Sequence, residues 1–317
     1  MTLQDLTARY VGIKQAAGAD FTSAAQLLSM FCRVVDGTAE IGAICDEQVR
    51  AFLDGQGPLT RYWHRKHSVL RGFYRYAVSR GYLAALPPVL TAVTPKSPPS
   101  CVPYLYTREE IRRLLDATAR YQKQRFHIPP LTFRTLLLVL YGSGLRIGEA
   151  LHLTLADVDL AAAVVTVRDT KFYKTRLVPL GPDLQRVVRK YAARRAASRW
   201  PQCPDAAFFV DRTGAPLLIG TVRRSFRRLR ARAGVMRTDG ARYQPRLHDF
   251  RHAFAVHRLT AWYREGADVQ QLLPCLATYL GHISIASTQV YLTMTPELLH
   301  EAARRFEHYA HREGCDG

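Results

Sequence analysis

Residues 131–149 read LTFRTLLLVLYGSGLRIGE, an apolar run followed by a turn rich in glycine and then by charged residues. The apolar density of residues 131–141 predicts a buried helix. Gly142 and Gly144 end that helix and permit a tight turn, because glycine adopts backbone angles that other residues avoid. A second helix is expected to begin near residue 145. The stretch therefore predicts a mainly helical core that contains a sharp, charged corner.

Arg146 and Glu149 are three residues apart in this second helix, so they share one face. The carboxylate can then orient the guanidinium through charged hydrogen bonds. The corner is not a nucleotide-binding phosphate loop, since the pattern GxxxxGK[ST] is absent. Taken alone, an arginine such as Arg146 is more often part of a structural ion pair than an anion-binding group.

The composition narrows the class of partner. The 317 residues include 45 Lys and Arg against 26 Asp and Glu, a net charge of +19. Residues 1–100 account for +4 of that charge, from 11 basic and 7 acidic residues, and the remainder carries +15. A polyanion matches this charge, and nucleic acid is the leading candidate, although solubility or an Arg-rich genome gives a plainer explanation. With 48% hydrophobic residues, disorder of the whole chain is excluded.

Nothing in the sequence directs the chain to a membrane or an oxidising compartment. The longest strongly apolar run, residues 136–140, is far too short to span a bilayer, and no secretory leader is visible at the N-terminus. The six cysteines are far apart and form no CxxC pair, so they predict reduced thiols. We expect a cytoplasmic, bacterial protein associated with the nucleoid.

The length suggests two domains, and prolines mark the boundary between them. Six prolines fall between residues 83 and 106, where locked backbone angles and missing amide donors favour an extended linker. We therefore expect a four-helix domain over residues 1–84, a linker over 85–105, a second domain over 106–295 and a C-terminal helix or tail over 296–317. The four N-terminal helices are predicted at residues 3–16, 22–35, 46–53 and 60–82.

The second domain is predicted to be helical with one small antiparallel sheet. Thr107 and Glu110 form a capping box that opens a helix through about residue 119. Strands are expected at residues 163–168 and 176–180, joined by a hairpin that carries Lys171 and Lys174. Further helices are predicted near residues 182–199, 220–233, 247–262, 268–280 and 284–292.

Two helices combine basic residues in a way that suits a nucleic-acid backbone. Residues 60–82 interleave aromatic and basic residues, and residues 220–233 are strongly basic. For any single arginine here, a place on a solvated helix face is the favoured explanation. The candidate DNA contacts are Arg61, Arg65, Lys66, Arg71, Arg75, Lys174, Arg223, Arg224 and Arg227.

The segment Leu247-His248-Asp249-Phe250-Arg251-His252 combines a proton-transfer group with an anion-binding group. His248 and Arg251 are three residues apart and share a face, so an imidazole lies beside a guanidinium, an arrangement that suits phosphoryl chemistry. His248 and His252 have the spacing of two metal ligands, but no HExxH glutamate or third ligand is evident. We therefore predict no metal site.

Two further groups complete the set of candidates. Leu280-Gly281-His282 is followed nine residues later by Tyr291, and this spacing distinguishes Tyr291 among the chain's 16 tyrosines. A flexible hairpin can also deliver an ammonium group to a leaving oxygen. On this ground both Lys171 and Lys174 remain candidates.

Taken in order, these residues resemble the tyrosine recombinases, a family that includes phage integrases and the Xer resolvases. The resemblance rests on Arg146 in GSGLRIGE, Lys171 in a hairpin, His248-x-x-Arg251, Leu-Gly-His282 and Tyr291, and it covers residues 105–295. It implies a catalytic domain of that family there, preceded by a four-helix core-binding (SAM-like) domain. The implied roles are nucleophile for Tyr291, phosphate binding for Arg146, Arg251 and His282, acid/base for His248, general acid for Lys171 and acidic support for Glu149.

Elementary chemistry agrees with these roles. A phenol has a pKa near 10 and attacks poorly at neutral pH unless a base such as His248 takes its proton. Two guanidiniums and an imidazole stabilise the charge that develops on the phosphorane, so no Mg²⁺ is required. A tyrosyl ester conserves the energy of the broken diester, and rejoining therefore needs no ATP. We expect no cofactor.

The leading hypothesis is a site-specific recombinase acting on double-stranded DNA, bound as a dimer on one site and as a homo-tetramer on two. Residues 296–309 are predicted to form an amphipathic helix that docks on a neighbouring protomer, or folds back on its own domain. Alternatives are a type IB topoisomerase-like enzyme and a catalytically silent DNA-binding protein. The sequence does not reveal the DNA target, the direction of the reaction, the host element or the need for accessory proteins.

Overall fold

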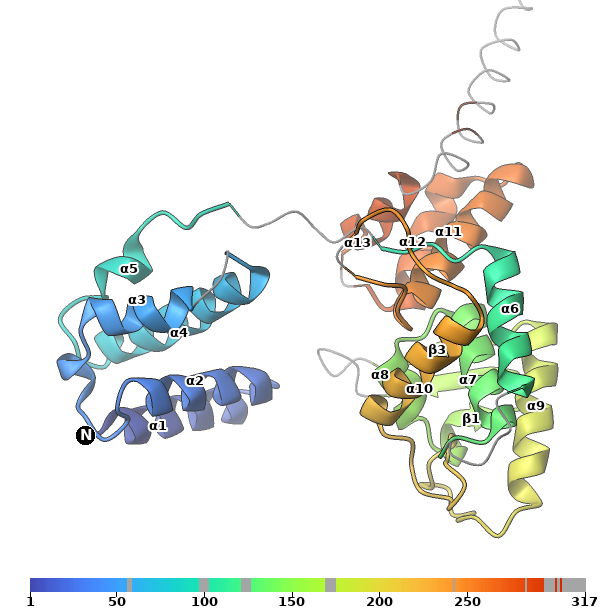
Figure 1. Cartoon of the computed structure of the whole chain (residues 1–317), viewed down its shortest axis with the longest axis horizontal. Coiled ribbons are helices and arrows are strands. Elements are labelled where there is room, and N and C mark those ends of the chain that lie inside the picture. Colours follow the sequence, from blue (N-terminus) through green and yellow to red (C-terminus); the bar gives the residue numbers. More distant parts are fainter. Residues whose placement is uncertain are drawn as a thin grey trace, which may run out of the picture. The chain divides into compact units, whose positions relative to one another are not determined.

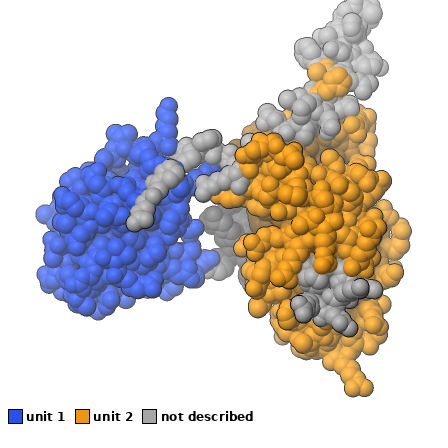
Figure 2. Space-filling model, in the orientation of Figure 1, with its two compact units in different colours: residues 1–100 blue, residues 101–317 orange. Residues whose placement is uncertain are grey.

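The structure is a computed structural model of the chain, and it divides into two compact units, residues 1–100 and 101–317 (Figure 2). Mainly helical architecture with one small antiparallel sheet confirms the predicted fold class (Figure 1). The described residues are 1–55, 59–96, 103–120, 127–168, 175–241, 243–282, 284–293, 300 and 303.

The first unit is built from four helices, as predicted, and a short fifth. Its first helix begins with a capping box, in which Thr2 and Asp5 each accept a hydrogen bond from the other's backbone N–H. The longest helix buries an apolar stripe that includes Trp63, Leu70 and Phe73 against the other helices. The helices are α1 (Leu3–Ala16), α2 (Thr22–Val34), α3 (Asp46–Asp54), α4 (Arg61–Ser79) and α5 (Pro88–Thr91).

Helix α5 corrects the predicted linker. Residues 85–105 were expected to be extended, but Pro88 begins a helical turn, a position where its missing N–H costs nothing. Val89 and Leu90 are buried in the first unit's core, and the Val89 N–H donates to the Asp46 carboxylate at 2.8 Å. The helical part of the first unit therefore continues to Thr91, the end of this turn.

The second unit is centred on α7, the apolar helix predicted at residues 131–141. It packs against α6, α9 and α11, which explains why most of its faces are buried. Helix α6 begins at the predicted Thr107–Glu110 capping box. The helices of this unit are α6 (Arg108–Ala119), α7 (Pro130–Ser143), α8 (Ile147–His152), α9 (Pro182–Ala196), α10 (Ile219–Arg232), α11 (Asp249–Arg264), α12 (Val269–Leu280) and α13 (Ala286–Gln289).

The sheet has three antiparallel strands in the order β1-β2-β3. Strands β2 (Val164–Val167) and β3 (Arg176–Pro179) were predicted, whereas β1 (Val158–Asp159) is too short to be recognised from sequence. Val165 pairs with Val178 in the β2–β3 register, and both side chains are buried in the core. This pairing anchors β3, the strand that begins with Arg176, to the core of the second unit.

The C-terminal part of the described chain forms a smaller apolar cluster. Helices α11 and α12 pack together, and α13 leads into a 3-10 turn, Val290–Thr293, where one helix was predicted over 284–292. Apart from residues 300 and 303, the predicted tail 296–317 lies outside the described residues. No helix among the described residues is both long and apolar enough to cross a bilayer. The four cysteines in the described ranges are free thiols.

Candidate active site

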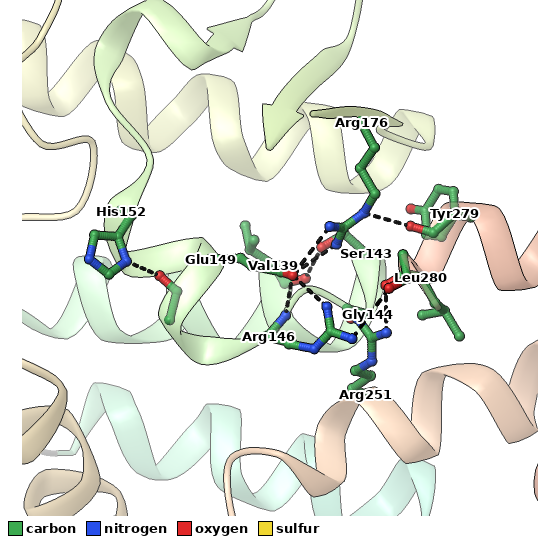
Figure 3. Close-up of polar contacts among 12 residues, drawn as sticks. Val139, Ser143, Gly144, Arg146, Glu149, His152, Arg176, Arg251, Tyr279 and Leu280 are labelled. Carbon is green, nitrogen blue, oxygen red and sulfur yellow. Dashed lines mark hydrogen bonds and ion pairs between the residues drawn. The ribbon is translucent and has the colours of Figure 1, made fainter. Parts of the chain in front are cut away.

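Two helix ends hold the arginines that the sequence singled out. Helices α7 and α12 both end at a left-handed glycine, Gly144 (φ 63°) and Gly281 (φ 68°). Arg251 of α11 donates to the Gly144 carbonyl at 2.9 Å and to the Leu280 carbonyl at 2.5 Å (Figure 3). Arg146 donates to the Gly281 carbonyl at 3.4 Å. The negative ends of two helix dipoles thus stabilise two guanidiniums.

Glu149 holds Arg146 on the other side. Its carboxylate accepts a 2.6 Å hydrogen bond from the Arg146 side chain and a 2.9 Å bond from the Arg146 backbone N–H. Arg176 of β3 forks onto the same carboxylate at 2.8 and 3.2 Å. Burial raises the pKa of Glu149, but Arg176 and Arg146 outweigh it and hold that pKa at about 2. The predicted pairing of Arg146 with Glu149 is present, with a second arginine added.

Tyr291 lies within this group of cations. Its side chain is 3% exposed, and Arg251 is 2% exposed. Burial raises the pKa of the Tyr291 phenol, while a hydrogen bond and the positive charge of Arg251, together with the charge of Arg146, act to lower it. A phosphate can reach this phenol and Arg251 only after the surrounding protein rearranges.

Two histidine rings lie beside the phenol, and a third lies behind one of them. The rings of His282 and His252 lie 6.1 and 5.5 Å from the Tyr291 ring, centre to centre, and His248 lies 4.9 Å from His252. His282 Nδ1 is hydrogen-bonded to the buried Thr288 hydroxyl at 2.7 Å, which fixes the ring. Burial, then nearby arginines, lowers the pKa of His282 to about 4 and also lowers the pKa of His248. Both rings are therefore neutral at pH 7.

The close packing around Gly144 leads to a testable prediction. An added Cβ would lie 2.6 Å from Phe254 Cδ1 and 2.8 Å from Leu280 Cδ2, at a backbone angle that L residues rarely adopt. We expect Gly144→Ala to lower the free energy of unfolding by about 3 kcal/mol, measured by urea denaturation. Gly148→Ala is the matched control, because no atom lies within 4 Å of its added Cβ. An unchanged stability for Gly144→Ala would contradict the packing.

As a whole, the arrangement suits phosphoryl transfer. Two guanidiniums and a neutral imidazole donate hydrogen bonds, His248 can accept a proton, and a phenol can attack. Among the described residues no cluster of three or more His, Cys, Asp or Glu lies together as a set of metal ligands.

Comparison with known proteins agrees with this geometry. Residues 105–297 match the sequence profile of the phage integrase family. The chain belongs to this family of tyrosine recombinases. It is 41% identical over 250 residues to "Putative integrase/recombinase y4rB" of Sinorhizobium fredii, covering 78% of both chains. It is 32% identical over 292 residues to tyrosine recombinase XerC of Rhodospirillum centenum, covering 88% of this chain and 79% of that protein.

Solved structures share the fold of this recombinase. The Tn1549 transposon integrase, in complex with transposon right end DNA, aligns over 98% of this chain and all of that one, with a TM-score of 0.67 and 16% identity. A lambda integrase tetramer bound to a Holliday junction aligns over 92% of this chain and 77% of that one, with a TM-score of 0.66 and 17% identity. At such identities these structures establish the fold alone.

The structure places most of the predicted site residues of the recombinase together. Arg146, Glu149, His248, Arg251, His282 and Tyr291 meet at the ends of α7, α11 and α12. Lys171 and Lys174 lie outside the described residues, so the predicted general acid is not placed. The described parts of the hairpin, β2 and β3, place its base beside the site through Arg176.

The candidate DNA contacts on α4 divide into two groups. Lys66 is wrong as an exposed contact: it is buried, its ammonium donates to the Phe52 carbonyl, and it lies 4.9 Å from the Phe52 ring centre. It lies on the buried side because it is three residues from Trp63 and four from Leu70. The other four candidates are exposed: Arg61, Arg65, Arg71 and Arg75.

Helix α10 presents its basic residues beside the site. Arg223, Arg224 and Arg227 are exposed, while Phe226 and Leu229 anchor the helix in the core. A cavity of about 670 Å³ separates α10 from residues 243–248, and it is lined by Arg223, Arg227, Arg230, Arg246 and His248 among others. Basic side chains therefore extend from the predicted acid/base residue across the surface of the recombinase.

Two residues of the site were missed as functional candidates. Arg176 was placed only at the start of a strand, and nothing in the sequence shows that its side chain turns inward. His252 was considered only as a metal ligand, yet its ring packs between His248 and Tyr291 with Nδ1 buried and unbonded. Its spacing of four residues from His248 was the available signal.

Proposed function

We propose that this chain is a site-specific recombinase that cuts and rejoins double-stranded DNA through a covalent 3′-phosphotyrosyl intermediate. One observation carries the proposal: the buried Tyr291 phenol lies against the Arg251 guanidinium inside the group of cations. Burying positive charge is costly, and buried cations gathered around a phenol are well placed to bind an anion. A scissile phosphate is the anion that a phenol nucleophile requires.

The proposed step exchanges one phosphate ester for another. The Tyr291 oxygen attacks phosphorus, and the bond to the 5′ oxygen of the next nucleotide breaks. His248 takes the phenolic proton, directly or through a water, and Lys171 supplies a proton to the leaving oxygen, with Lys174 as the alternative donor. A 5′-hydroxyl from a second strand then attacks the tyrosyl ester and reverses the step, so no ATP is needed.

The cations stabilise the transition state. Charge develops on the nonbridging oxygens of the phosphorane, where Arg146, Arg251 and His282 donate hydrogen bonds. Each such donor contributes on the order of 3 kcal/mol when it is desolvated and held in place. The helix-end carbonyls and Glu149 hold the two guanidiniums before DNA arrives, so these donors need little reorientation once the phosphate has reached them.

A pH dependence follows from the lowered pKa of His248. Protonated imidazole cannot accept the phenolic proton, so cleavage is lost as pH falls through the pKa of this group. Because burial and Arg251 lower that pKa, we expect the acid limb of the second-order cleavage rate to lie below the ordinary value of about 6.5. His248→Gln should remove this limb. An inflection above pH 6.5 in the wild type would contradict the assignment.

DNA contacts are proposed along the exposed arginines of α4 and α10. We propose that the DNA backbone lies over the cavity beside α10, because His248 is one of the residues that line this cavity. Backbone contacts of this kind are strongly salt-dependent, so affinity should fall steeply with ionic strength. We place this activity at the nucleoid of a bacterial cytoplasm, where such a substrate lies.

We propose a dimer on one DNA site and a tetramer on two. A lambda integrase has been solved as a tetramer bound to a Holliday junction, and this chain shares its fold. The second unit also carries a mostly apolar cavity of about 660 Å³, lined by Phe254, Trp262, Leu276 and Tyr279 among others. Residues 296–309 of a neighbouring protomer, with their apolar stripe, suit this cavity in composition.

The decisive experiment uses the DNA that flanks the gene as substrate. A nicked duplex carrying those ends should trap the protein covalently through a 3′ phosphate. Relaxation of a supercoiled plasmid without any target site would favour a topoisomerase-like activity instead. If the wild type binds the ends but forms no adduct on a nicked site, the protein is a DNA-binding accessory factor.

A further inference from the structure

Arg176 links three parts of the site. It is the first residue of β3 and follows Lys171 by five positions. Its guanidinium forks onto Glu149 at 2.8 and 3.2 Å, and its Nε donates to the Tyr279 carbonyl at 3.0 Å (Figure 3). The side chains of Arg176 and Glu149 are both only 10% exposed. A bidentate pair in such surroundings fixes both partners in one geometry.

The contact with Tyr279 places Arg176 against the turn that ends α12. The next two carbonyls along that turn, those of Leu280 and Gly281, hold Arg251 and Arg146. A Cβ on Gly281 would lie 2.9 Å from Arg176 Nη1, so the guanidinium fills the space beside the turn. Arg176 therefore supports the acceptors of both phosphate-binding arginines.

The contact with Glu149 supports Arg146 from the other side. Among the groups that lower the pKa of Glu149, Arg176 has the largest effect, through its hydrogen bond and its charge, and Arg146 follows. Arg251 of α11 is a further positive charge that interacts with Glu149. Without Arg176, this nearly buried carboxylate would keep Arg146 as its one bonded counter-ion among the residues that the structure describes.

We propose that Arg176 is a positioning residue for strand cleavage: it locks strand β3, Glu149 and the α12 turn together so that Arg146 is held for the phosphate. It does not touch DNA itself. The inference rests on the proposed function, because it assigns Arg176 to the same phosphoryl transfer.

The test compares Arg176→Gln and Arg176→Lys with a matched control, Arg168→Gln. Arg168 directly follows β2, its side chain is 59% exposed, and it pairs with Asp157 at 2.6 Å rather than with Glu149. We expect Arg176→Gln to slow single-turnover cleavage about 100-fold and Arg176→Lys about 10-fold, with DNA affinity within about 3-fold of wild type. Arg168→Gln should cleave within about 2-fold of wild type.

A pH profile separates positioning from a purely structural role. Losing Arg176 lets the pKa of Glu149 rise toward its ordinary value of about 4.3, and the neutral acid no longer holds Arg146. Because His248 sets the acid limb of the wild type, the comparison is made in a His248→Gln background, where adding Arg176→Gln should make cleavage fall at a higher pH, on the acid side only. Circular dichroism at each pH shows whether the variants stay folded.

The outcomes are distinct. Wild-type cleavage rates in both Arg176 variants, or equal losses in Arg176→Gln and Arg168→Gln, would overturn the inference and leave the proposed function standing. An unshifted acid limb when Arg176→Gln is added to His248→Gln, with Arg176→Lys as slow as Arg176→Gln, would reduce Arg176 to a structural contact. Absence of any adduct with the wild type would overturn the proposed function instead.

Discussion

Tyr291→Phe should bind its DNA site as tightly as the wild type and form no covalent adduct. The substitution removes one oxygen from a buried ring and leaves the packing against His252 and His282 in place. Because the hydroxyl is the proposed nucleophile, its loss removes the step altogether, and cleavage should drop below detection, a decrease of at least about 10⁴-fold. The measurement is the yield of protein–DNA adduct on a nicked cognate duplex, resolved by denaturing electrophoresis.

The control for this result is a second tyrosine in the same domain. Tyr191 packs on Phe208 and Phe209, and its hydroxyl donates to the Phe208 carbonyl at 3.1 Å. Tyr191→Phe removes an equivalent buried hydroxyl but should retain adduct formation within about 3-fold, since a neutral hydrogen bond contributes only about 1 kcal/mol. An adduct that persists in Tyr291→Phe would exclude Tyr291 as the nucleophile.

The sequence predicted the members of the site because the chemistry lies in local spacings. Arg146 is the N-cap residue of α8 and forms a capping box with Glu149, and His248 is the N-cap residue of α11, three positions before Arg251. Both pairings therefore follow from the local geometry of a helix's first turn. Gly142 and Gly144 marked the corner for the same local reason. These features can be predicted because a turn and a helix start depend on residues that are neighbours in the sequence.

What escaped prediction depends on contacts between distant segments. Arg176 reaches Glu149 across 27 positions and the Tyr279 carbonyl across 103, and no periodicity in the sequence reports such a pairing. Lys66 is a different case, because its spacing from Trp63 and Leu70 already placed it on the buried stripe. Because Lys66 is charged, this spacing was not taken as a sign of burial. An ammonium group on an apolar face needs a polar partner, and here the partner is the Phe52 carbonyl.

Helix α5 shows the limit of composition as a guide. Prolines in residues 85–105 argued for an extended chain, but proline also suits the first turn of a helix. What decided the outcome was the burial of Val89 and Leu90 against the first unit, together with the Asp46 carboxylate that accepts the Val89 N–H. A tertiary contact thus overrode the local tendency.

Arg251→Ala should slow cleavage about 10³-fold, the second largest effect expected. The guanidinium is buried, and burial, then the charge of Arg146, lowers its pKa to about 10, so it remains positively charged at pH 7. A desolvated charge that faces developing negative charge contributes most in the transition state. Arg251→Lys keeps the charge but loses the fork that Gly144 and Leu280 hold, so we expect a loss of about 10²-fold.

Stability must be separated from chemistry in this variant. Arg251→Ala leaves the carbonyls of Gly144 and Leu280 without their donor and opens a cavity, which should lower the free energy of unfolding by about 2–4 kcal/mol. Cleavage is therefore measured at a temperature where circular dichroism shows the variant folded.

A methylphosphonate at the scissile position then tests the cause. This analogue lacks one charged nonbridging oxygen, so a guanidinium that neutralises that charge becomes less important to the transition state. If Arg251 acts on the phosphate, the deficit of Arg251→Ala relative to wild type should shrink at least about 10-fold on this substrate. A deficit of the same size on both substrates would assign Arg251 to holding the turns of α7 and α12 rather than to charge stabilisation.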